Sequence, residues 1–107
     1  MTDPAAILVL CTAPDEDVAT RLARGLVNER LAACVNLLPG VRSFYRWKGE
    51  VHEDPEVQLL IKTRASRLEA LEVYLEREHP YEVPEIVAVP LARVEAKYLK
   101  WMVEQTE

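Results

Sequence analysis

Two periodicities of hydrophobic and polar residues alternate along the chain and predict its secondary structure. Short apolar runs, or apolar residues at every second position, predict strands over residues 6–11, 34–38, 41–47, 51–63 and 85–91. Apolar residues that recur at three- and four-residue spacing predict helices over residues 15–32, 66–78 and 94–104. Gly25 is a mild weakness inside the first of these helices.

Turn-forming and capping residues mark the boundaries between these segments. Pro14 ends the first strand, and the acidic run 15–17 supplies negative charge where a helix N-terminus favours it. Pro39-Gly40 predicts a bend or bulge within a long hairpin whose tight turn is Lys48-Gly49. The series Ser66-Arg67-Leu68-Glu69 fits a capping box and predicts that the second helix starts at Ser66.

The order of the segments is strand, helix, strand, strand, helix, strand, followed by a C-terminal helix. Because crossover connections are right-handed, this order predicts an α+β, ferredoxin-like split βαβ fold. Its antiparallel sheet has the strand order 4-1-3-2, and both crossover helices cover the same face. The 107 residues, half of them hydrophobic, suffice for one domain over 1–107 whose core needs no disulfide or metal.

Composition and charge argue against several classes of function. The chain has 13 Lys+Arg against 18 Asp+Glu, and its net charge of −5 argues against nucleic-acid binding. No run reaches the roughly 18 apolar residues of a membrane span, so no membrane partner is expected. The acidic Asp3 and a short apolar run do not fit a signal peptide, which favours a cytoplasmic protein. Cys11 and Cys34 lack CxxC spacing, and we expect both to be reduced.

The stretch 78–89 carries a histidine on a turn held by two prolines. Pro80 and Pro84 each lock their own φ and push the preceding residue out of the helical region, so a helix that arrives at Glu78 must stop. His79 is one of only two histidines in the chain. We therefore expect a short turn of fixed course, which holds His79 beside the strand that pairs with the last one.

Six short motifs stand in a fixed order along nearly the whole chain. They are Leu10–Glu16, Glu29–Asn36, Pro39-Gly40, Tyr45–Glu50, Leu60–Thr63 and His79–Ile86. No single motif is diagnostic, but the series, at this spacing, resembles the CutA family of divalent-cation tolerance proteins. The resemblance implies a ferredoxin-like protomer in a tight homotrimer, with copper(II) as the associated ligand and zinc among the other divalent cations.

The resemblance also implies Cys11 and His79 as metal residues. Some relatives have a second histidine just before the latter; here the position is Glu78, a harder and less copper-selective ligand. The expected topology brings the three residues together, because the first strand and the second helix both end at the same edge of the sheet. With the fourth strand beside the first, thiol, imidazole and carboxylate meet across one strand spacing, about 4.8 Å.

Each candidate residue also has a structural interpretation. Cys11 can be a small core residue, since buried cysteine is common. Its place before a helix N-terminus favours a thiolate, while the acidic residues 15–17 oppose one. His79, at a helix C-terminus, can simply complement the helix dipole. Cys34 is interpreted as structural and His52 as a solvated strand residue.

Nucleic-acid binding and catalysis are both disfavoured by the residues present. The aromatic cluster Phe44, Tyr45 and Trp47 could stack bases, but RNA-binding domains of this fold stack them from the two central strands. Here the central strands, 7–11 and 57–63, contain no aromatic residue, so packing against a partner subunit is the better interpretation. The loop 12–16, which binds an anion in acylphosphatases of this fold, is acidic and would repel phosphate. We do not expect an enzyme.

Both alternation sets of the inner strands are apolar, although two helices cover only one face of the sheet. Leaving the second apolar face exposed to water costs about 25 cal/mol of free energy per Å². This cost predicts a homo-oligomer with this face and the hairpin in its interface. The resemblance makes it a trimer. The leading hypothesis is a trimeric, copper-binding protein of divalent-cation tolerance. The alternative is a trimeric regulator, similar to PII signalling proteins, that binds a small molecule or protein partner and contacts metals only incidentally.

Overall fold

The structure is a computed structural model that describes residues 5–107. Within these residues the sheet has four antiparallel strands: β1 Ala6–Ala13, β2 Cys34–Trp47, β3 Glu50–Arg64 and β4 Val87–Pro90. The helices are α1 Glu16–Asn28, α2 Leu68–Glu78 and α3 Ala96–Gln105, with a 3-10 turn at Ala65–Arg67. The strand order β2-β3-β1-β4 is the predicted 4-1-3-2 read from the other edge, so the α+β ferredoxin-like fold is confirmed.

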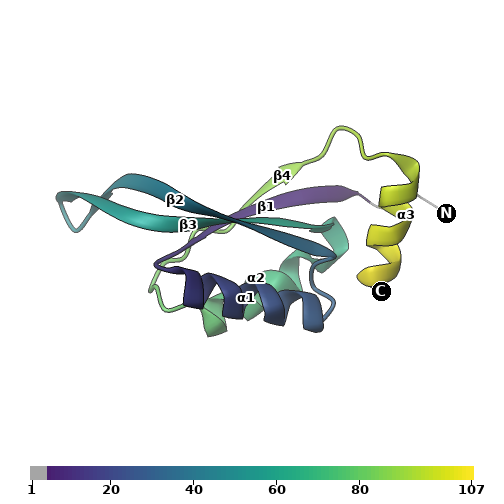
Figure 1. Cartoon of the computed structure of the whole chain (residues 1–107), viewed down its shortest axis with the longest axis horizontal. Coiled ribbons are helices and arrows are strands. Elements are labelled where there is room, and N and C mark those ends of the chain that lie inside the picture. The colour runs from purple at the N-terminus through teal and green to yellow at the C-terminus, as the bar shows by residue number, and fades with distance from the viewer. Residues whose placement is uncertain (1–4) are drawn as a thin grey trace.

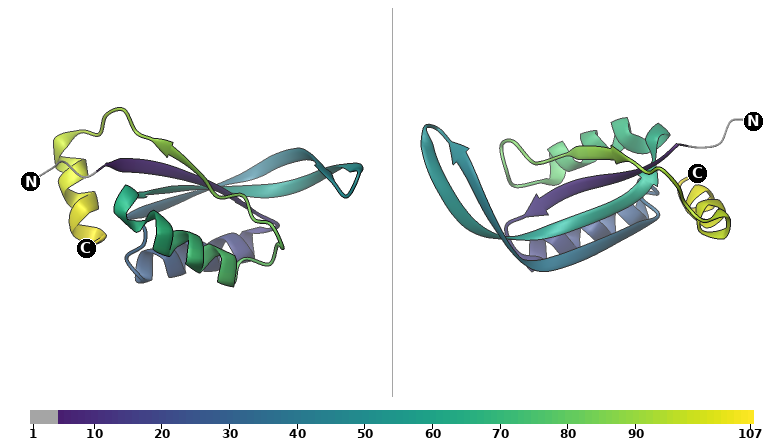
Figure 2. Two further views of the ribbon diagram at one scale, coloured as in Figure 1. Left: turned by 180° about the vertical axis from the view of Figure 1, so that it is seen from behind. Right: turned by 90° about the horizontal axis from the view of Figure 1, so that it is seen from above.

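The elements form two layers with a projecting arm (Figure 1). α1 and α2 lie side by side on one face of the sheet, whereas α3 lies at the end where β1 begins (Figures 1 and 2). The outer halves of β2 and β3 extend past the helix layer as a hairpin, and the molecule measures 49 × 26 × 23 Å. The ends of β1 and α2 lie at the hairpin end of the molecule, which is where the candidate residues meet.

The core lies between α1, α2 and the sheet face that they cover. β1 and β3 pair so that Val9 lies opposite Ile61 and Cys11 opposite Leu59, and all four are fully buried. The helices add buried residues at helical spacing, which are Ala19, Leu22 and Leu26 of α1 and Leu71, Tyr74 and Leu75 of α2. Burial of each large side chain here contributes about 1.5–3 kcal/mol to stability.

α1 begins as predicted but ends earlier. The Asp15 carboxylate accepts a hydrogen bond from the Val18 N–H at 2.8 Å and caps the first turn. The helix ends at Asn28, so the prediction of a helix to residue 32 was wrong. Arg30 is left-handed, with φ 59°, and the N–H of Leu31 returns to the carbonyl five residues earlier at 2.9 Å. These are features of a Schellman motif, which usually has glycine at the left-handed position and is therefore hidden in this sequence.

The predicted capping box at Ser66 is not formed. Ala65–Arg67 make a 3-10 turn, and α2 begins at Leu68 with no side-chain capping hydrogen bond. A capping serine needs extended backbone, but the extended residue here is Arg64, with φ −103° and ψ 151°. Ser66 already lies inside the turn, which is why the prediction was wrong.

Gly25 has a packing role that the sequence did not reveal. A Cβ at this position would lie 1.7 Å from the hydroxyl oxygen of Tyr74, a buried residue of α2. The missing side chain therefore lets the two helices approach closely. The residue predicted to weaken α1 is the one that allows α2 to pack against it.

The hairpin contains both predicted irregularities. Its register shifts between Leu38 and Val41, and Gly40 adopts φ 80° in this bulge. The turn residues Lys48-Gly49 have φ 50° and 82°, as a two-residue turn that matches the strand twist requires. β1 pairs with β3 only as far as Val57, so the outer part of the hairpin is a two-stranded ribbon.

The second face of the sheet, which we call the open face, is apolar over β1 and β4 and more polar over β2 and β3. It carries Leu8, Leu10 and Leu60, beside Val87 and Val89 of β4, which are 50% and 39% exposed. Neither α1 nor α2 covers this face (Figure 1). Within residues 5–107, no helix is both long enough and apolar enough to cross a membrane.

Candidate functional site

His79 lies where the end of α2 meets the end of β1, and both of its ring nitrogens are engaged. The residue is buried. Its Nε2 lies 2.8 Å from the Thr12 carbonyl oxygen, and its Nδ1 accepts a hydrogen bond from the Tyr81 N–H at 3.1 Å. The two bonds require the tautomer that carries its proton on Nε2. The Tyr81 ring packs against the imidazole with a centroid distance of 4.6 Å.

Cys11 is fully buried on the helix-covered face of β1. Its Sγ donates to the Thr12 carbonyl oxygen at 3.7 Å. Burial raises the pKa of the thiol to about 12, and the negative charges of Glu85 and Glu56 act in the same direction. Cys11 is therefore a protonated thiol at neutral pH, as the core-residue interpretation expects.

Glu78, the last residue of α2, faces arginines. Its Oε1 lies 3.4 Å from Nη1 of Arg21 in α1, and its Oε2 lies 2.9 Å from Nε of Arg77. The Arg21 Nη2 also donates to the Glu78 carbonyl oxygen at 2.9 Å. These contacts tie the end of α2 to α1 and direct the carboxylate toward α1.

The structure thus brings together two of the three predicted metal residues. Cys11 and His79 both point to the carbonyl oxygen of Thr12, while Glu78 is paired with arginines. Thiol and imidazole are donors that copper and zinc favour, but an ion here would replace the hydrogen bonds to that oxygen. Among residues 5–107, no three His, Cys, Asp or Glu side chains are grouped so that they could hold a metal ion.

The other cysteine and the other histidine lie elsewhere. Cys34 pairs with Lys62 near the far end of the sheet, and its Sγ lies 3.8 Å from the side-chain oxygen of Asn36. His52 lies on the hairpin and stacks on Tyr45, with ring centroids 5.4 Å apart. Neither residue approaches the Thr12 carbonyl.

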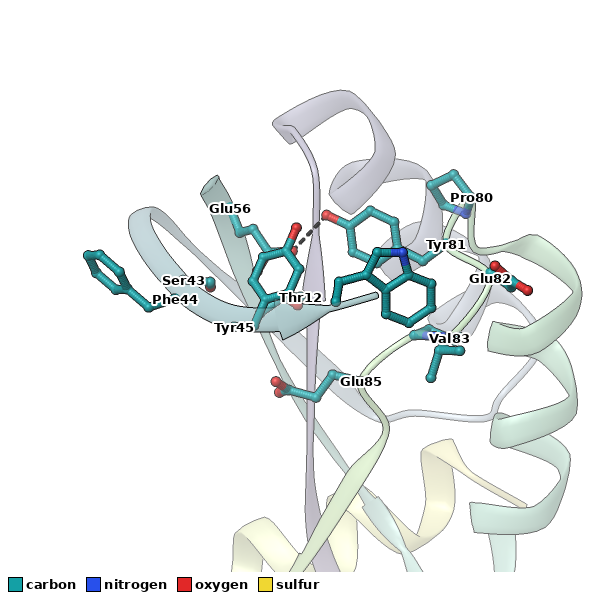
Figure 3. Close-up of a pocket in the computed structure, with 12 residues that line it drawn as sticks. Thr12, Ser43, Phe44, Tyr45, Glu56, Pro80, Tyr81, Glu82, Val83 and Glu85 are labelled. Carbon is teal, nitrogen blue, oxygen red and sulfur yellow. Dashed lines mark hydrogen bonds between the residues drawn. The ribbon is translucent and has the colours of Figure 1, made fainter. Parts of the chain in front are cut away.

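A pocket of about 740 Å³ opens next to this point, between the hairpin and the loop that follows α2 (Figure 3). Its lining residues come from the end of β1, from β2, from β3 and from that loop. They are Thr12, Ser43, Phe44, Tyr45, Trp47, Glu56, Pro80, Tyr81, Glu82, Val83, Pro84 and Glu85. Aromatic rings and carboxylates therefore share one concave surface.

Glu56 and Tyr81 form the polar centre of this pocket. Glu56 is only 8% exposed, and its Oε2 accepts a hydrogen bond from the Tyr81 hydroxyl at 2.6 Å (Figure 3). Burial raises the pKa of Tyr81, and the hydrogen bond to Glu56 raises it further. On the hairpin side, the Tyr45 hydroxyl donates to Asp54.

Sequence reasoning gave Glu56 and Tyr81 no role. A signal was present, because Glu56 is a carboxylate directly before the mostly apolar segment 57–61 of a central strand. Tyr81 stands in the turn that was singled out for His79. What the sequence did not reveal is that the hairpin curves over this turn, which is a property of the folded sheet.

The fold is thus a ferredoxin-like sheet with a projecting hairpin, and a cysteine and a histidine lie together at the end of β1. The family model described as CutA1 divalent ion tolerance protein matches residues 7–105. The divalent-cation tolerance protein CutA of Thermus thermophilus is 52% identical over 99 residues, which are 92% of this chain and 96% of that protein. The protein of the same name from Pectobacterium atrosepticum is 47% identical over 97 residues, 91% of this chain and 88% of that one.

Solved structures agree with this match. CutA1 from Oryza sativa superposes with a TM-score of 0.95 at 42% identity, covering 100% of this chain and 98% of that chain. The divalent cation tolerance protein Cut A1 of Thermus thermophilus superposes with a TM-score of 0.93 at 50% identity, covering 95% and 99%. The chain belongs to the CutA1 divalent ion tolerance family, which confirms the resemblance of its motifs. The names of the bacterial relatives describe divalent-cation tolerance and no reaction.

Proposed function

We propose that this protein is a homotrimeric, cytoplasmic divalent-cation-binding protein in the response to metal ions. Copper(II) is the main ligand that we propose, and zinc is a further divalent ligand. The observation that carries the proposal is the meeting of a thiol and an imidazole at the end of β1. The Cys11 thiol and the His79 imidazole lie 3.7 and 2.8 Å from one carbonyl oxygen. Sulfur and imidazole nitrogen are the ligands that copper and zinc prefer over calcium or magnesium.

Ion binding at this pair competes with protons and with the hydrogen bonds described above. Because the Cys11 thiol has a raised pKa of about 12, an ion must displace its proton, so Cu(II) affinity rises about tenfold per pH unit around neutrality. The imidazole must release one of its two hydrogen bonds. Glu78 must leave two arginines to contribute, and we assign it the smallest share among the three ligands.

The binding test uses matched alanine variants and calorimetric titration with Cu(II). Cys11→Ala and His79→Ala each weaken binding, whereas Cys34→Ala and His52→Ala do not, because neither residue approaches the pair. Light scattering checks that assembly is intact in each variant. Unchanged Cu(II) binding by the Cys11→Ala/His79→Ala double variant, with intact assembly, overturns the proposed site.

The open face supports self-association, and the family resemblance makes the proposed oligomer a trimer. Val87 and Val89 are 50% and 39% exposed there, and Phe44 on the projecting hairpin is 62% exposed. Exposed apolar surface of this kind marks association sites. Val87→Lys with Val89→Lys converts the trimer to monomers by light scattering, while the matched change Val27→Lys with Val73→Lys on α1 and α2 does not. A monomeric wild-type protein at micromolar concentration contradicts the proposal.

The alternative function, a small-molecule regulator similar to PII signalling proteins, is favoured by one specific observation. The pocket that holds Glu56 and Tyr81 has a volume of about 740 Å³, within the range of small-molecule sites. Metal titration beside a metabolite screen separates the two functions. A metabolite that binds at lower concentration than Cu(II), with Cys11 and His79 uninvolved, favours the regulator.

A further inference from the structure

The pocket beneath the hairpin has walls suited to hydrocarbon and to positive charge. Tyr45 and Trp47 of β2 both line it, and the two residues alternate onto the same face of that strand. Tyr45 and Val83 lie on opposite sides of the pocket, the first on the hairpin and the second on the loop after α2 (Figure 3). Aromatic rings attract cations through their faces, in addition to the apolar area that they bury. A metal ion gains little from such walls, because they offer few lone pairs.

The charged groups of the pocket all have the same sign. Among the described residues that line it, none is a lysine, arginine or histidine, whereas Glu56, Glu82 and Glu85 are carboxylates. The nearby Lys48 ammonium lies 5.9 Å from the Trp47 ring centroid, outside the lining. An anionic ligand would meet three carboxylates in the lining, and a cationic one would relieve the repulsion between them.

Glu56 supplies the anchoring group. It is 8% exposed, so its charge is largely withdrawn from water. Its Oε2 accepts the Tyr81 hydroxyl at 2.6 Å, and among the described residues no hydrogen bond reaches Oε1. A buried carboxylate with one free oxygen that lines a cavity is a strong acceptor for an N–H donor.

We propose that this pocket binds a small organic cation, of the alkylammonium or arylalkylammonium class. The ammonium group bonds to Glu56, and the hydrocarbon body packs against Tyr45, Trp47 and Val83. An inorganic divalent ion is disfavoured in this pocket, since the three carboxylates of its lining are not grouped closely enough to hold a metal ion together. The site is distinct from the Cys11–His79 pair, because neither of those side chains lines the pocket.

The test compares three probes of one shape and different charge at pH 7. They are 2-phenylethylamine, which is a cation, 2-phenylethanol, which is neutral, and 3-phenylpropionate, which is an anion. The cation binds with a dissociation constant of millimolar or below by calorimetry and shifts the amide resonance of Tyr81 and the indole N–H resonance of Trp47. The alcohol binds at least about tenfold more weakly, as loss of a charge-assisted hydrogen bond predicts, and the anion does not bind.

Matched variants locate the charge that matters. Glu56→Gln keeps the shape and an acceptor for Tyr81 but removes the charge, and it weakens 2-phenylethylamine binding about tenfold or more. Glu69→Gln makes the same change on an exposed position of α2 and has no effect. Cys11→Ala, which removes a proposed Cu(II) ligand, also leaves amine binding unchanged, so the two proposals fail independently.

Three results overturn the proposal. The first is equal binding of the amine and the alcohol, because charge then plays no part. The second is an unchanged amine affinity in a Glu56→Gln variant that is folded by circular dichroism. The third is a crystal structure in which side chains of a second copy of the chain fill the pocket, because the cavity is then a subunit contact.

Discussion

The two faces of the sheet use the same kinds of residue for different purposes. Leu59 faces α1 and α2 and is fully buried, while its neighbour Leu60 faces the open side and is only half-buried. In β1, Val9 is buried on the helix side, whereas Leu8 on the open side keeps part of its surface. One alternation set builds the core of the protomer, and the other forms the surface at which we propose that subunits associate.

The difference teaches that apolar content alone does not say whether a residue serves folding or assembly. A strand buried on one face normally alternates apolar and polar residues. In β1 both sets are apolar, yet α1 and α2 cover only one face. Variants that change neighbouring residues on opposite faces therefore separate the two purposes.

The largest expected effect comes from truncating a residue on the helix-covered face. Leu59→Ala leaves a cavity between the sheet and the two helices and lowers the free energy of unfolding by about 3 kcal/mol. Leu60→Ala lowers it by less than half as much and acts instead on the concentration dependence of thermal unfolding. Urea denaturation of both variants at two protein concentrations checks this. If both variants lose the same free energy of unfolding at both protein concentrations, the two faces do not differ in purpose.

A second effect follows from the buried thiol of the helix-covered face. The pKa of Cys11 rises from 9.0 to about 12 in the folded chain. Between these values the unfolded chain loses the proton and the folded chain keeps it, so stability falls as pH rises above about 9, by up to about 1.4 kcal/mol per pH unit. Below pH 9 both states are protonated and the contribution is fully present.

Chemical denaturation between pH 8 and pH 11 measures this slope. In the Cys11→Ala variant the free energy of unfolding falls less steeply with pH than in the wild type. The contribution of the thiol is gone, while that of Tyr81, whose pKa is also raised, remains. Val9→Ala, which removes apolar volume from the same face without a titratable group, keeps the wild-type slope. An identical slope in the Cys11→Ala variant would show that the thiol does not titrate as described.

The smallest expected effect compares two hydroxyl groups. The Thr63 hydroxyl, on the helix-covered face, donates to the Leu31 carbonyl oxygen at 2.7 Å. Thr63→Val keeps the shape, leaves that oxygen without its partner and costs about 1 kcal/mol. Thr12→Val, on the other face, removes a hydroxyl that makes no side-chain hydrogen bond within the described residues and costs less. Thermal unfolding of the two variants gives the comparison.

The fold could be predicted because its signals are local. The periods of two and of about 3.6 residues fixed element types, and right-handed crossovers fixed the strand order. Errors occurred where backbone dihedral angles depend on distant packing. Arg30 takes a left-handed conformation without being glycine, and Ser66 lies in a 3-10 turn that moves the start of α2 to Leu68.

The candidate site was predictable to the level of topology. The meeting of Cys11 and His79 follows from two elements that end at one edge of the sheet. The sheet face toward which Cys11 points could also be predicted, since Cys11 alternates with Ile7 and Val9 and so shares their buried face. The pairing of Glu78 with Arg21 depends on a contact across 57 positions of sequence, which no local pattern predicts.

The two-stranded hairpin has a consequence for local unfolding of the molecule. Between Val41 and Glu56 the two strands pair only with each other, and most of their side chains are exposed. A ribbon with no third strand and no core beneath it is marginally stable, so in a single subunit it opens as its own cooperative unit, ahead of global unfolding. In the trimer that we propose, subunit association orders this ribbon at a cost in free energy. The hydrogen-exchange protection of Phe44 and Val51 then reports assembly before any change in the core.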